Sequence, residues 1–315
     1  MKLLVVGAGA VGSLFAARLA AAGYDVELTA RPEHVSAIRA QGLRVEGTTP
    51  GTYHPIALGS LAEAASPDAV LVTVKTFDLA ETASALGRRF PLLPPTLLPQ
   101  NGLHVERSFA DALPPAVRSG VPRAVVRAIN SIPVTLVGPG VIRQAGVGQL
   151  LLRDPGSGGP EAEATAEFVE LLRRAELPVR LVVDFERELW RKALVNAAIN
   201  PVTAIRRVPN GRLLEPPFRD EAIALLREAQ RAAAAAGVPF SDDEAERDFE
   251  RVARATAENR SSMLQDLDRG RPTEIDAISG EIVRTAGGHG IDLPRTRAAI
   301  AQLHAATSGP RTQPS

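Results

Sequence analysis

The amino-acid sequence predicts two domains: an N-terminal α/β domain with an open, doubly wound and mostly parallel sheet, and a C-terminal all-helical domain. Up to Asp184, short apolar runs typical of strands alternate with helical patterns. A glycine-rich turn directly follows the first run, and every segment after Asp184 has helical periodicity. We therefore expect domains at 1–184 and 185–315, with a disordered tail from about residue 307.

The first domain is expected to begin with strand, glycine turn, helix and strand, which together form one βαβ unit. The first strand spans 2–6, its helix ends at Ala22 before Gly23, and the second strand covers 25–31. Later in this domain, a surface loop at 154–160 precedes a helix at 161–175. Further strands are expected at 69–74, 96–99, 124–129, 148–153 and 179–183.

The second domain is expected to consist of helices separated by proline and glycine, the residues that most often end a helix. Two such borders are "GVP" at 237–239 and "GRPT" at 270–273. The expected helices span 185–206, 216–236, 242–268, 273–286 and 294–306.

The composition excludes several classes of protein. A hydrophobic fraction of 45% suits a globular chain, and a formal net charge of zero does not suggest a nucleic-acid binder. With no cysteine, the chain has no disulfide and no thiol nucleophile, and its five histidines lack metal-ligand spacing, so no metal site is expected. No apolar run reaches the ~20 residues of a membrane span. The N-terminus makes a poor signal peptide, so we expect a cytoplasmic protein.

The glycine turn has the pattern G-x-G-x-x-G. Glycine triplets often mark only tight turns, but this one follows a strand and opens a helix, which is the context of a Rossmann-type dinucleotide site. The glycines allow the turn, the close approach of a pyrophosphate and the packing of helix on strand. The expected cofactor-binding residues here are Gly7, Ala8, Gly9, Ala10, Val11 and Gly12.

Two basic residues favour NADP over NAD. An NAD site usually has an acidic residue at the end of the second strand, whereas this strand ends in Ala30 and Arg31. Arg31 suits a 2′-phosphate, although it could instead be a solvated loop residue. Lys75 ends the strand at 69–74, at the sheet edge where ligands bind. At the same edge, Asn101 in "PQNGLH" could form a simple turn or reach the nicotinamide ribose or a substrate.

The helix expected at 185–206 carries a polar stripe within an apolar sequence. Each four-residue step rotates only ~40° around a helix, so Lys192, Asn196 and Asn200 lie on one narrow face. The stripe could be a solvated face, but such faces in this chain carry Arg, Glu and Asp. Only three of the 36 basic residues are lysines. A buried polar stripe needs hydrogen-bond partners, which a ligand can supply.

A reductase would use this stripe. Hydride addition to a carbonyl carbon produces an alkoxide, which a cation that also donates a proton stabilises and neutralises. Lysine can release its proton, whereas arginine cannot. Further uncharged groups that could contact a ligand are Asn210 and the serines at 261–262.

The sequence resembles the ketopantoate reductase (2-dehydropantoate 2-reductase) family of pantothenate biosynthesis, from Met1 to about His304. The resemblance rests on "GAGAVG", "VKT", "QNG", "ELWRKALVNAAINPVTAI" through "PNG", and "SSMLQDLDRGRPTEID". It implies an NADP-dependent oxidoreductase with a Rossmann domain, a helical domain and an active site in the cleft between them.

The resemblance also assigns roles to individual residues. It implies that Lys192 donates the proton, and that Glu274 approaches the cofactor and helps to order the closed site. It gives the 2′-phosphate to Arg31 and Lys75, and gives Asn101 contacts with both cofactor and substrate. The expected keto-acid ligands are Asn196, Asn200, Asn210 and Ser262.

One departure and several alternatives stay open at this point. Where the family usually has "QNGxG", this chain has His104 in place of the last glycine, which puts the path of the loop in question. The substrate could be another 2-oxo acid or an imine, and a regulatory NADP-binding protein without turnover is a third hypothesis. The oligomeric state stays open between monomer and homodimer.

Overall fold

The structure is a computed structural model that describes residues 1–119, 125–156 and 159–308. It divides into two compact units. The first contains Met1–Gln100 and Val105–Phe185; the second contains Asn101–His104 and Glu186–Ser315. The division lies next to the boundary expected at 184, except that the short segment Asn101–His104 is grouped with the helices. Most of the tail expected to be disordered, 309–315, lies outside the described residues.

Within its described residues, the first unit has an eight-stranded sheet in the order β12-β11-β8-β7-β6-β1-β2-β5. Neighbouring strands are parallel except β8 and β11. The strands are β1 (Lys2–Val6), β2 (Asp25–Thr29), β5 (Ile56–Leu58), β6 (Ala69–Val72), β7 (Thr96–Leu98), β8 (Val125–Asn130), β11 (Leu150–Arg153) and β12 (Val179–Val182).

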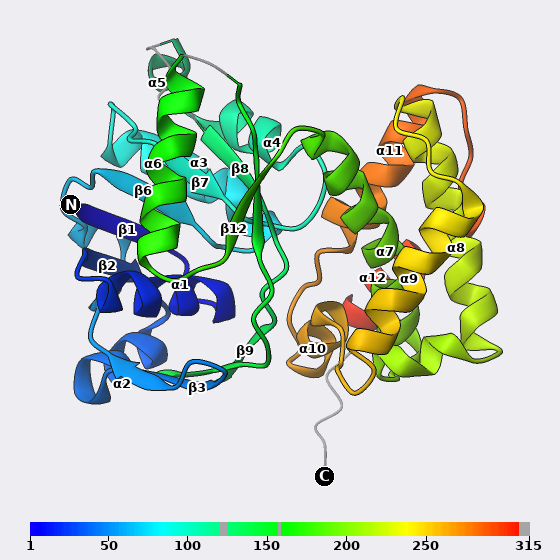
Figure 1. Ribbon diagram of the computed structural model, residues 1–315, viewed down its shortest axis with the longest axis horizontal. Coiled ribbons are helices and arrows are strands. Elements are labelled where there is room, and N and C mark those ends of the chain that lie inside the picture. The colour runs from blue at the N-terminus through cyan, green and yellow to red at the C-terminus, as the bar shows by residue number, and fades with distance from the viewer. Residues whose placement is uncertain (120–124, 157–158, 309–315) are drawn as a thin grey trace. The chain divides into compact units, whose positions relative to one another are not determined.

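Helices cover both faces of this sheet (Figure 1), as expected for a doubly wound fold. Successive side chains of β1 point to opposite faces, so Leu3 and Val5 join one core and Leu4 and Val6 the other. The first core includes α1 (Ala10–Ala21) and α6 (Pro160–Arg174), and the second includes α3 (Leu79–Arg89) and α4 (Val105–Ala112). Burial on both faces explains why β1 and β6 are almost entirely apolar.

A small second sheet in the same unit was not expected from the sequence. Its order is β4-β3-β10-β9, and its strands are short, with glycine at one end of β3, β4 and β9. The four strands are β3 (Leu43–Gly47), β4 (Gly51–Tyr53), β9 (Val134–Gly138) and β10 (Val141–Gln144). The short helices α2 (Pro32–Gln41) and α5 (Pro115–Ser119) complete the described part of the unit.

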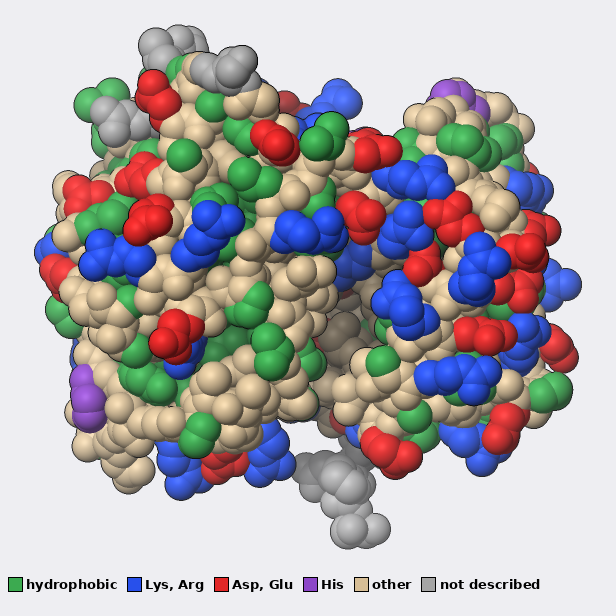
Figure 2. Space-filling model, viewed as in Figure 1, with side chains coloured by type: hydrophobic (Ala, Val, Ile, Leu, Met, Phe, Trp, Pro, Cys, Tyr) green, Lys and Arg blue, Asp and Glu red, His purple; other side chains and the backbone are tan. Residues whose placement is uncertain are grey.

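The second unit is helical in its described residues, and basic and acidic side chains are interspersed on the face seen in Figure 2. The α/β sheet and the helical unit together confirm the predicted fold class. The helices are α7 (Phe185–Arg206), α8 (Phe218–Ala235), α9 (Asp242–Ala255), α10 (Ser262–Asp268), α11 (Glu281–Gly288) and α12 (Pro294–Ser308). None of the helices in the described ranges is both long and apolar enough to cross a membrane.

The single helix expected at 242–268 was a wrong prediction, because the chain leaves helical geometry between α9 and α10. Asn210 and Gly211 donate main-chain hydrogen bonds to the carbonyls of Asn259 and Ala257, both at 3.0 Å. The side chain of Ser261 then caps α10 by accepting from the Leu264 amide at 3.2 Å. Contacts with a distant segment therefore interrupt a sequence with continuous helical periodicity.

Candidate active site

The glycine turn of the first unit connects β1 to α1. Gly7 has φ +101°, and an added Cβ would lie 2.6 Å from a methyl group of Val74. A Cβ on Gly12 would collide with the Gly7 carbonyl and with the Thr73 hydroxyl, which itself donates to that carbonyl at 2.8 Å. A Cβ on Gly9 would meet nothing within 4 Å. Two glycines therefore close the turn, and the third leaves its outer side open.

This arrangement fits a pyrophosphate. Gly9 is the N-cap of α1 and has no side chain to cap the first turn, so the main-chain amides there can bind an anion. The turn itself is held by strand β2, because the Gly7 amide donates to the Thr29 hydroxyl at 3.1 Å and the Ala8 amide donates to the Thr29 carbonyl at 2.8 Å. The expected contact residues Ala10 and Val11 lie in this first helical turn.

Arg31 and Lys75 flank the glycine turn. Strand β1 lies between β2 and β6 in the sheet, and both residues follow the carboxyl end of their strand. Arg31 is exposed and Lys75 is half-buried. Partial burial of its carboxyl raises the pKa of Asp78, three residues after Lys75, and the positive charge of Arg31 acts in the opposite direction. Arg31 is therefore within electrostatic range of the segment that follows Lys75.

His34 supports the same edge, and the sequence analysis missed it. It is 4% exposed, and its Nδ1 accepts the Gly140 amide at 2.8 Å while its Nε2 lies 3.0 Å from the Ser13 hydroxyl. Nδ1 is an acceptor, so the neutral ring carries its proton on Nε2 and donates to Ser13. Burial lowers the pKa of His34, although Glu33 acts to raise it. The neutral ring thus ties the starts of α1 and α2 together.

In the second unit, Asn101 lies beside Glu274. The Asn101 amide donates to the Glu274 carboxylate at 3.4 Å, and Glu274 is 7% exposed. Next to Asn101, Gly102 has φ +97°, and an added Cβ would collide with the Ala277 carbonyl. Ala277 belongs to a π-helical turn, Asp276–Gly280, a conformation that is rare and often found at functional sites. The "QNG" and "TEID" motifs, 173 residues apart in the chain, therefore meet.

The polar stripe of α7 is partly buried. Lys192 and Asn196 are half-buried and Asn200 is 6% exposed, while Ala193, Ala197 and the other neighbouring residues are apolar and buried. One turn further along, the Thr203 hydroxyl donates to Ser261 at 2.7 Å, which holds the "SS" segment against α7. Ser261 is buried as a helix cap, whereas the expected ligand Ser262 is exposed. The hydroxyl of Ser262 is thus accessible.

Asn210 has a defined orientation with one acceptor unused. Its Nδ2 donates at 2.9 Å to the Thr256 hydroxyl. That hydroxyl donates its only hydrogen to the Val252 carbonyl at 2.7 Å. The hydroxyl can therefore only accept from Asn210, so the amide cannot be flipped. Asn210 is 7% exposed, and its buried Oδ1 has no hydrogen-bond partner among the described residues. An acceptor left in this way needs a donor from a ligand or from water.

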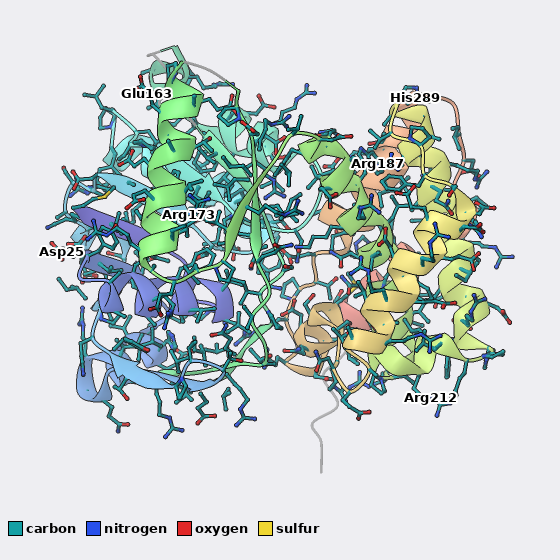
Figure 3. All side chains as sticks on the ribbon, in the orientation of Figure 1. Asp25, Glu163, Arg173, Arg187, Arg212 and His289 are labelled. Atoms are coloured by element: carbon teal, nitrogen blue, oxygen red, sulfur yellow. The ribbon has the colours of Figure 1, made fainter. Side chains whose placement is uncertain are left out.

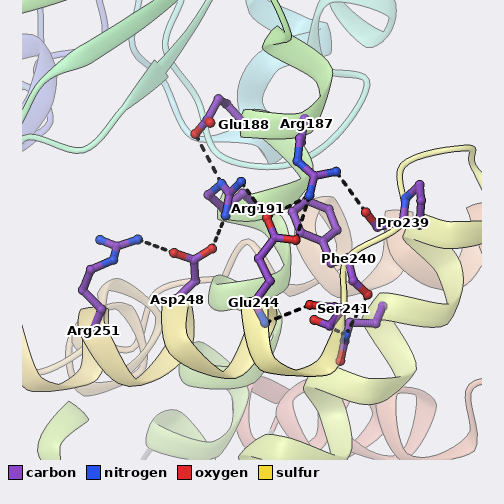
Figure 4. A network of polar contacts seen from close by, with 10 residues as sticks. Arg187, Glu188, Arg191, Pro239, Phe240, Ser241, Glu244, Asp248 and Arg251 are labelled. Carbon is purple, nitrogen blue, oxygen red and sulfur yellow. Dashed lines mark hydrogen bonds and ion pairs between the residues drawn. The ribbon is translucent and has the colours of Figure 1, made fainter.

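An ion-pair network fixes the rotation of α7, and the sequence analysis did not identify it (Figure 4). Arg187, labelled also in Figure 3, donates to both carboxylate oxygens of Glu244 at 2.8 and 2.7 Å. Arg191 donates to Glu244 at 3.0 Å and to Asp248, and Phe240 packs against both guanidinium groups, at 4.4 and 5.4 Å from its ring centre. Because Arg191 directly precedes Lys192, clamping Arg191 onto α9 sets the direction of Lys192.

The network holds both acidic groups ionised. Burial acts to raise the pKa of Glu244, but hydrogen bonds from Arg187 and Arg191 hold it below its usual value. Burial likewise acts against Asp248, and bonds from Arg251 and Arg191 lower its pKa. The spacing of Arg187 and Arg191, one turn apart on α7, was the signal in the sequence, but it did not indicate a partner.

The fold and these sites define a two-domain protein with a Rossmann-type unit and a helical unit. A family model described as ketopantoate reductase PanE/ApbA matches residues 3–155, and one for the C terminal part of the same family matches 184–307. The 2-dehydropantoate 2-reductase of Archaeoglobus fulgidus is 35% identical, over 98% of both chains. That of Halobacterium salinarum is 33% identical, over 96% of this chain and 98% of its own. The chain belongs to the ketopantoate reductase family.

Solved structures agree with this assignment. A PanE/ApbA family ketopantoate reductase from Ralstonia eutropha has a TM-score of 0.84 at 32% identity, covering 98% of each chain. A D-mandelate dehydrogenase, solved with NADH and anilino(oxo)acetate, has a TM-score of 0.86 at 22% identity, covering 98% of each chain. At that identity the second likeness concerns the fold alone.

Proposed function

We propose that the protein reduces 2-dehydropantoate (ketopantoate) to pantoate with NADPH, a step of pantothenate and coenzyme A biosynthesis. The single observation that carries the proposal is the α7 stripe, where Lys192, Asn196 and Asn200 share one face, the first two half-buried and the third buried. The relatives named 2-dehydropantoate 2-reductase, similar over nearly the whole chain, support this choice of substrate.

A nicotinamide cofactor, when bound, supplies the hydride for this reduction. The open side of Gly9 and the amides of the first turn of α1 suit its pyrophosphate, and the Cβ-free contacts of Gly7 and Gly12 preserve that turn. Arg31 and Lys75 would hold a 2′-phosphate by charge-assisted hydrogen bonds. Asn101 and Glu274 would contact the cofactor together, as their mutual hydrogen bond suggests.

The second unit supplies the acid. In the proposed reaction Lys192 Nζ stabilises the negative charge that develops on the ketone oxygen and transfers a proton to it. Asn196, Asn200 and Ser262 hold the keto acid through neutral hydrogen bonds. Glu274 orders the site through Asn101.

The hydroxyl of ketopantoate is the group that distinguishes this substrate from simpler keto acids. We propose that it donates to Asn210 Oδ1, the acceptor that has no partner among the described residues. A site built for a hydroxyl can reject an analogue without one by ~10⁴ or more, because its own polar group is left unpaired.

The experiment follows the absorbance of NADPH with ketopantoate and with 3,3-dimethyl-2-oxobutanoate, which lacks only the hydroxyl. We expect kcat/KM to be much lower for the analogue, and Asn210→Ala to narrow the difference. The matched control is Asn259→Ala, since Asn259 lies in the same region with an exposed side chain. Equal rates for both keto acids would favour a reductase of another 2-oxo acid, and no turnover of either, with NADPH still bound, would favour a regulator.

A further inference from the structure

Arg127 is a buried cation in the middle of the α/β sheet. It lies on β8, is 6% exposed, and donates from Nη1 to the carbonyls of Leu98 at 2.7 Å and Ala128 at 3.0 Å. Its Nη2 donates to the Gln100 carbonyl at 2.6 Å. Its Nε forms an ion pair with Glu106 at 3.4 Å. One side chain therefore binds two carbonyls of the segment that leads from β7 into the "QNG" motif.

These bonds restrict the main chain that leads to Asn101. A peptide group is planar, so a bond to the Gln100 carbonyl also fixes the plane that contains the Asn101 nitrogen and Cα. The bond to the Leu98 carbonyl fixes the Leu98–Pro99 peptide plane in the same way. Only the Pro99–Gln100 peptide lies between the two fixed planes, and the ring of Pro99 locks its φ. The two Nη atoms of the Arg127 guanidinium therefore fix the main-chain position from which the Asn101 side chain extends.

The Gln100 side chain extends this support to the neighbouring strand. Its Nε2 donates to the Val72 carbonyl at 2.7 Å and to the Val74 carbonyl at 3.3 Å, at the carboxyl end of β6. Lys75 is the next residue. Arg127, in the middle of β8, and Gln100 therefore join the carboxyl ends of β6 and β7 to β8.

Stability alone does not explain a charge in this position. Burying an ion is costly, and an apolar side chain of similar size often gives an equally stable or more stable core. Arginine does provide a rigid planar fork with five donors, which a lysine or an apolar residue cannot imitate. The benefit lies in the fixed direction of the carbonyls that it binds.

We propose that Arg127 is a positioning residue that holds Asn101 in the orientation required to contact cofactor and substrate. The proposal rests on the proposed function, in which Asn101 makes those contacts. Arg127 acts through the Gln100–Asn101 peptide, so its effect on the reaction should depend on the Asn101 side chain.

A double-mutant cycle tests this dependence. Arg127→Lys should lower kcat/KM by about 10- to 100-fold when Asn101 is present, and by less than about threefold in the Asn101→Ala background. The matched control is Arg18→Lys. Arg18 is also buried, at 8% exposure, and donates to a carbonyl, that of Ala175 at 3.1 Å, but far along the chain from the motif. Its effect should be the same in both backgrounds. Equal factors for Arg127→Lys in both backgrounds would overturn the proposal.

A second measurement separates this proposal from the proposed function. Hydrogen exchange of the amides at 100–104 requires no substrate, and it should become faster in Arg127→Met but not in Arg18→Met. Faster exchange in Arg127→Met, together with a wild type that reduces no keto acid, would refute the proposed function but support the positioning of the motif by Arg127. Unchanged exchange would refute the positioning. If both Arg127 variants fail to fold, Glu106→Gln replaces them in both experiments, because Glu106 is the partly exposed ion-pair partner of Arg127 Nε. The same results would then support or overturn the proposal.

Discussion

The glycine turn and the α7 stripe present polar groups to a ligand in opposite ways. In the turn the groups are main-chain amides, and Gly7, Gly9 and Gly12 matter because they have no side chain. In the stripe the main chain is bonded within the helix, except that Pro201 has no N–H for the Ala197 carbonyl, so the ligand meets mainly the side chains of Lys192 and its neighbours. The turn should therefore be sensitive to any added atom, and the stripe to the removal of particular atoms.

The two regions also differ in what keeps them in place. Thr29 and Thr73, which are 22 and 66 residues from Gly7 in the chain, hold the turn from neighbouring strands by uncharged hydrogen bonds to its main chain. The stripe depends on the Arg191 clamp to α9, whose partners are 53 and 57 residues away. Substitutions in the two regions should therefore distinguish ligand binding by side chains from ligand binding by main-chain amides.

The largest effect is expected for Lys192→Ala, which removes the charge and the proton from the stripe. We expect kcat to fall by ~10³ or more, because both are needed mainly in the transition state. Lys192→Arg should restore little, since arginine does not release its proton. Steady-state kinetics with Lys2→Ala as the matched loss of a lysine check this prediction. Normal turnover in the Arg variant would leave Lys192 with a purely electrostatic role.

Alanine substitutions at two glycines of the turn should separate an effect on folding stability from an effect on NADPH binding. Gly12→Ala places a methyl group against the Gly7 carbonyl, and should destabilise the fold by on the order of 3 kcal/mol. Gly9→Ala meets no protein atom, so its melting temperature should change little while NADPH binding weakens at least ~10-fold through contact with the ligand. Thermal melts and NADPH titrations measure the two effects. Tight NADPH binding by Gly9→Ala would argue against a pyrophosphate on that side.

Arg31, like Lys75, is expected to act near the turn through its side chain. Arg31→Ala should weaken NADPH binding by about 10- to 100-fold, the loss expected for hydrogen bonds to a charged group. Binding of NADH should change less than about threefold. Fluorescence titration with both cofactors tests this, with Arg39→Ala, on the same helix, as the control. If both cofactors lose affinity equally, Arg31 does not contact the 2′-phosphate.

The clamp on α7 should make the stability of the helical unit depend on pH. The pKa values of Glu244 and Asp248 are lowered in the folded protein from unfolded values of 4.5 and 3.8. Their contribution to stability is therefore complete above these unfolded values and is lost as pH falls through the folded pKa values. Between pH 6 and pH 3.5 the wild type should lose on the order of 1 kcal/mol more than Glu244→Gln. Urea unfolding at both pH values measures the difference, and an identical loss in the two proteins would contradict the prediction.

The smallest effect concerns His104, which replaces the usual glycine of the family motif. The structure answers how the loop accommodates it: His104 has φ +55°, the left-handed conformation that glycine adopts freely. His104→Gly should change stability by less than ~0.5 kcal/mol, because relief of strain is offset by greater freedom of the unfolded chain. His104→Val should cost about 1 kcal/mol, since a β-branched residue avoids this conformation. Denaturation of the two variants decides the matter.

Local patterns in the sequence were sufficient for the elements that depend only on neighbouring residues. The strand at 2–6, the turn after it and the helix at 185–206 have the bounds that the sequence predicts. The alternation of apolar runs and helices predicts the doubly wound sheet for the same reason. The stripe on α7 could also be derived, because Lys192, Asn196 and Asn200 are related by helical geometry alone.

Tertiary structure decided the features that depend on residues distant in the chain. The break at 256–261 exists because Asn210 and Gly211 bond to its carbonyls, and no local pattern contains that information. The small sheet pairs β3 with β10, about 100 residues apart, so each short strand has little signal of its own. Arg127, His34 and Arg191 look like three ordinary basic residues in the sequence. Their roles arise from the carbonyls, amides and carboxylates that the folded chain places around them.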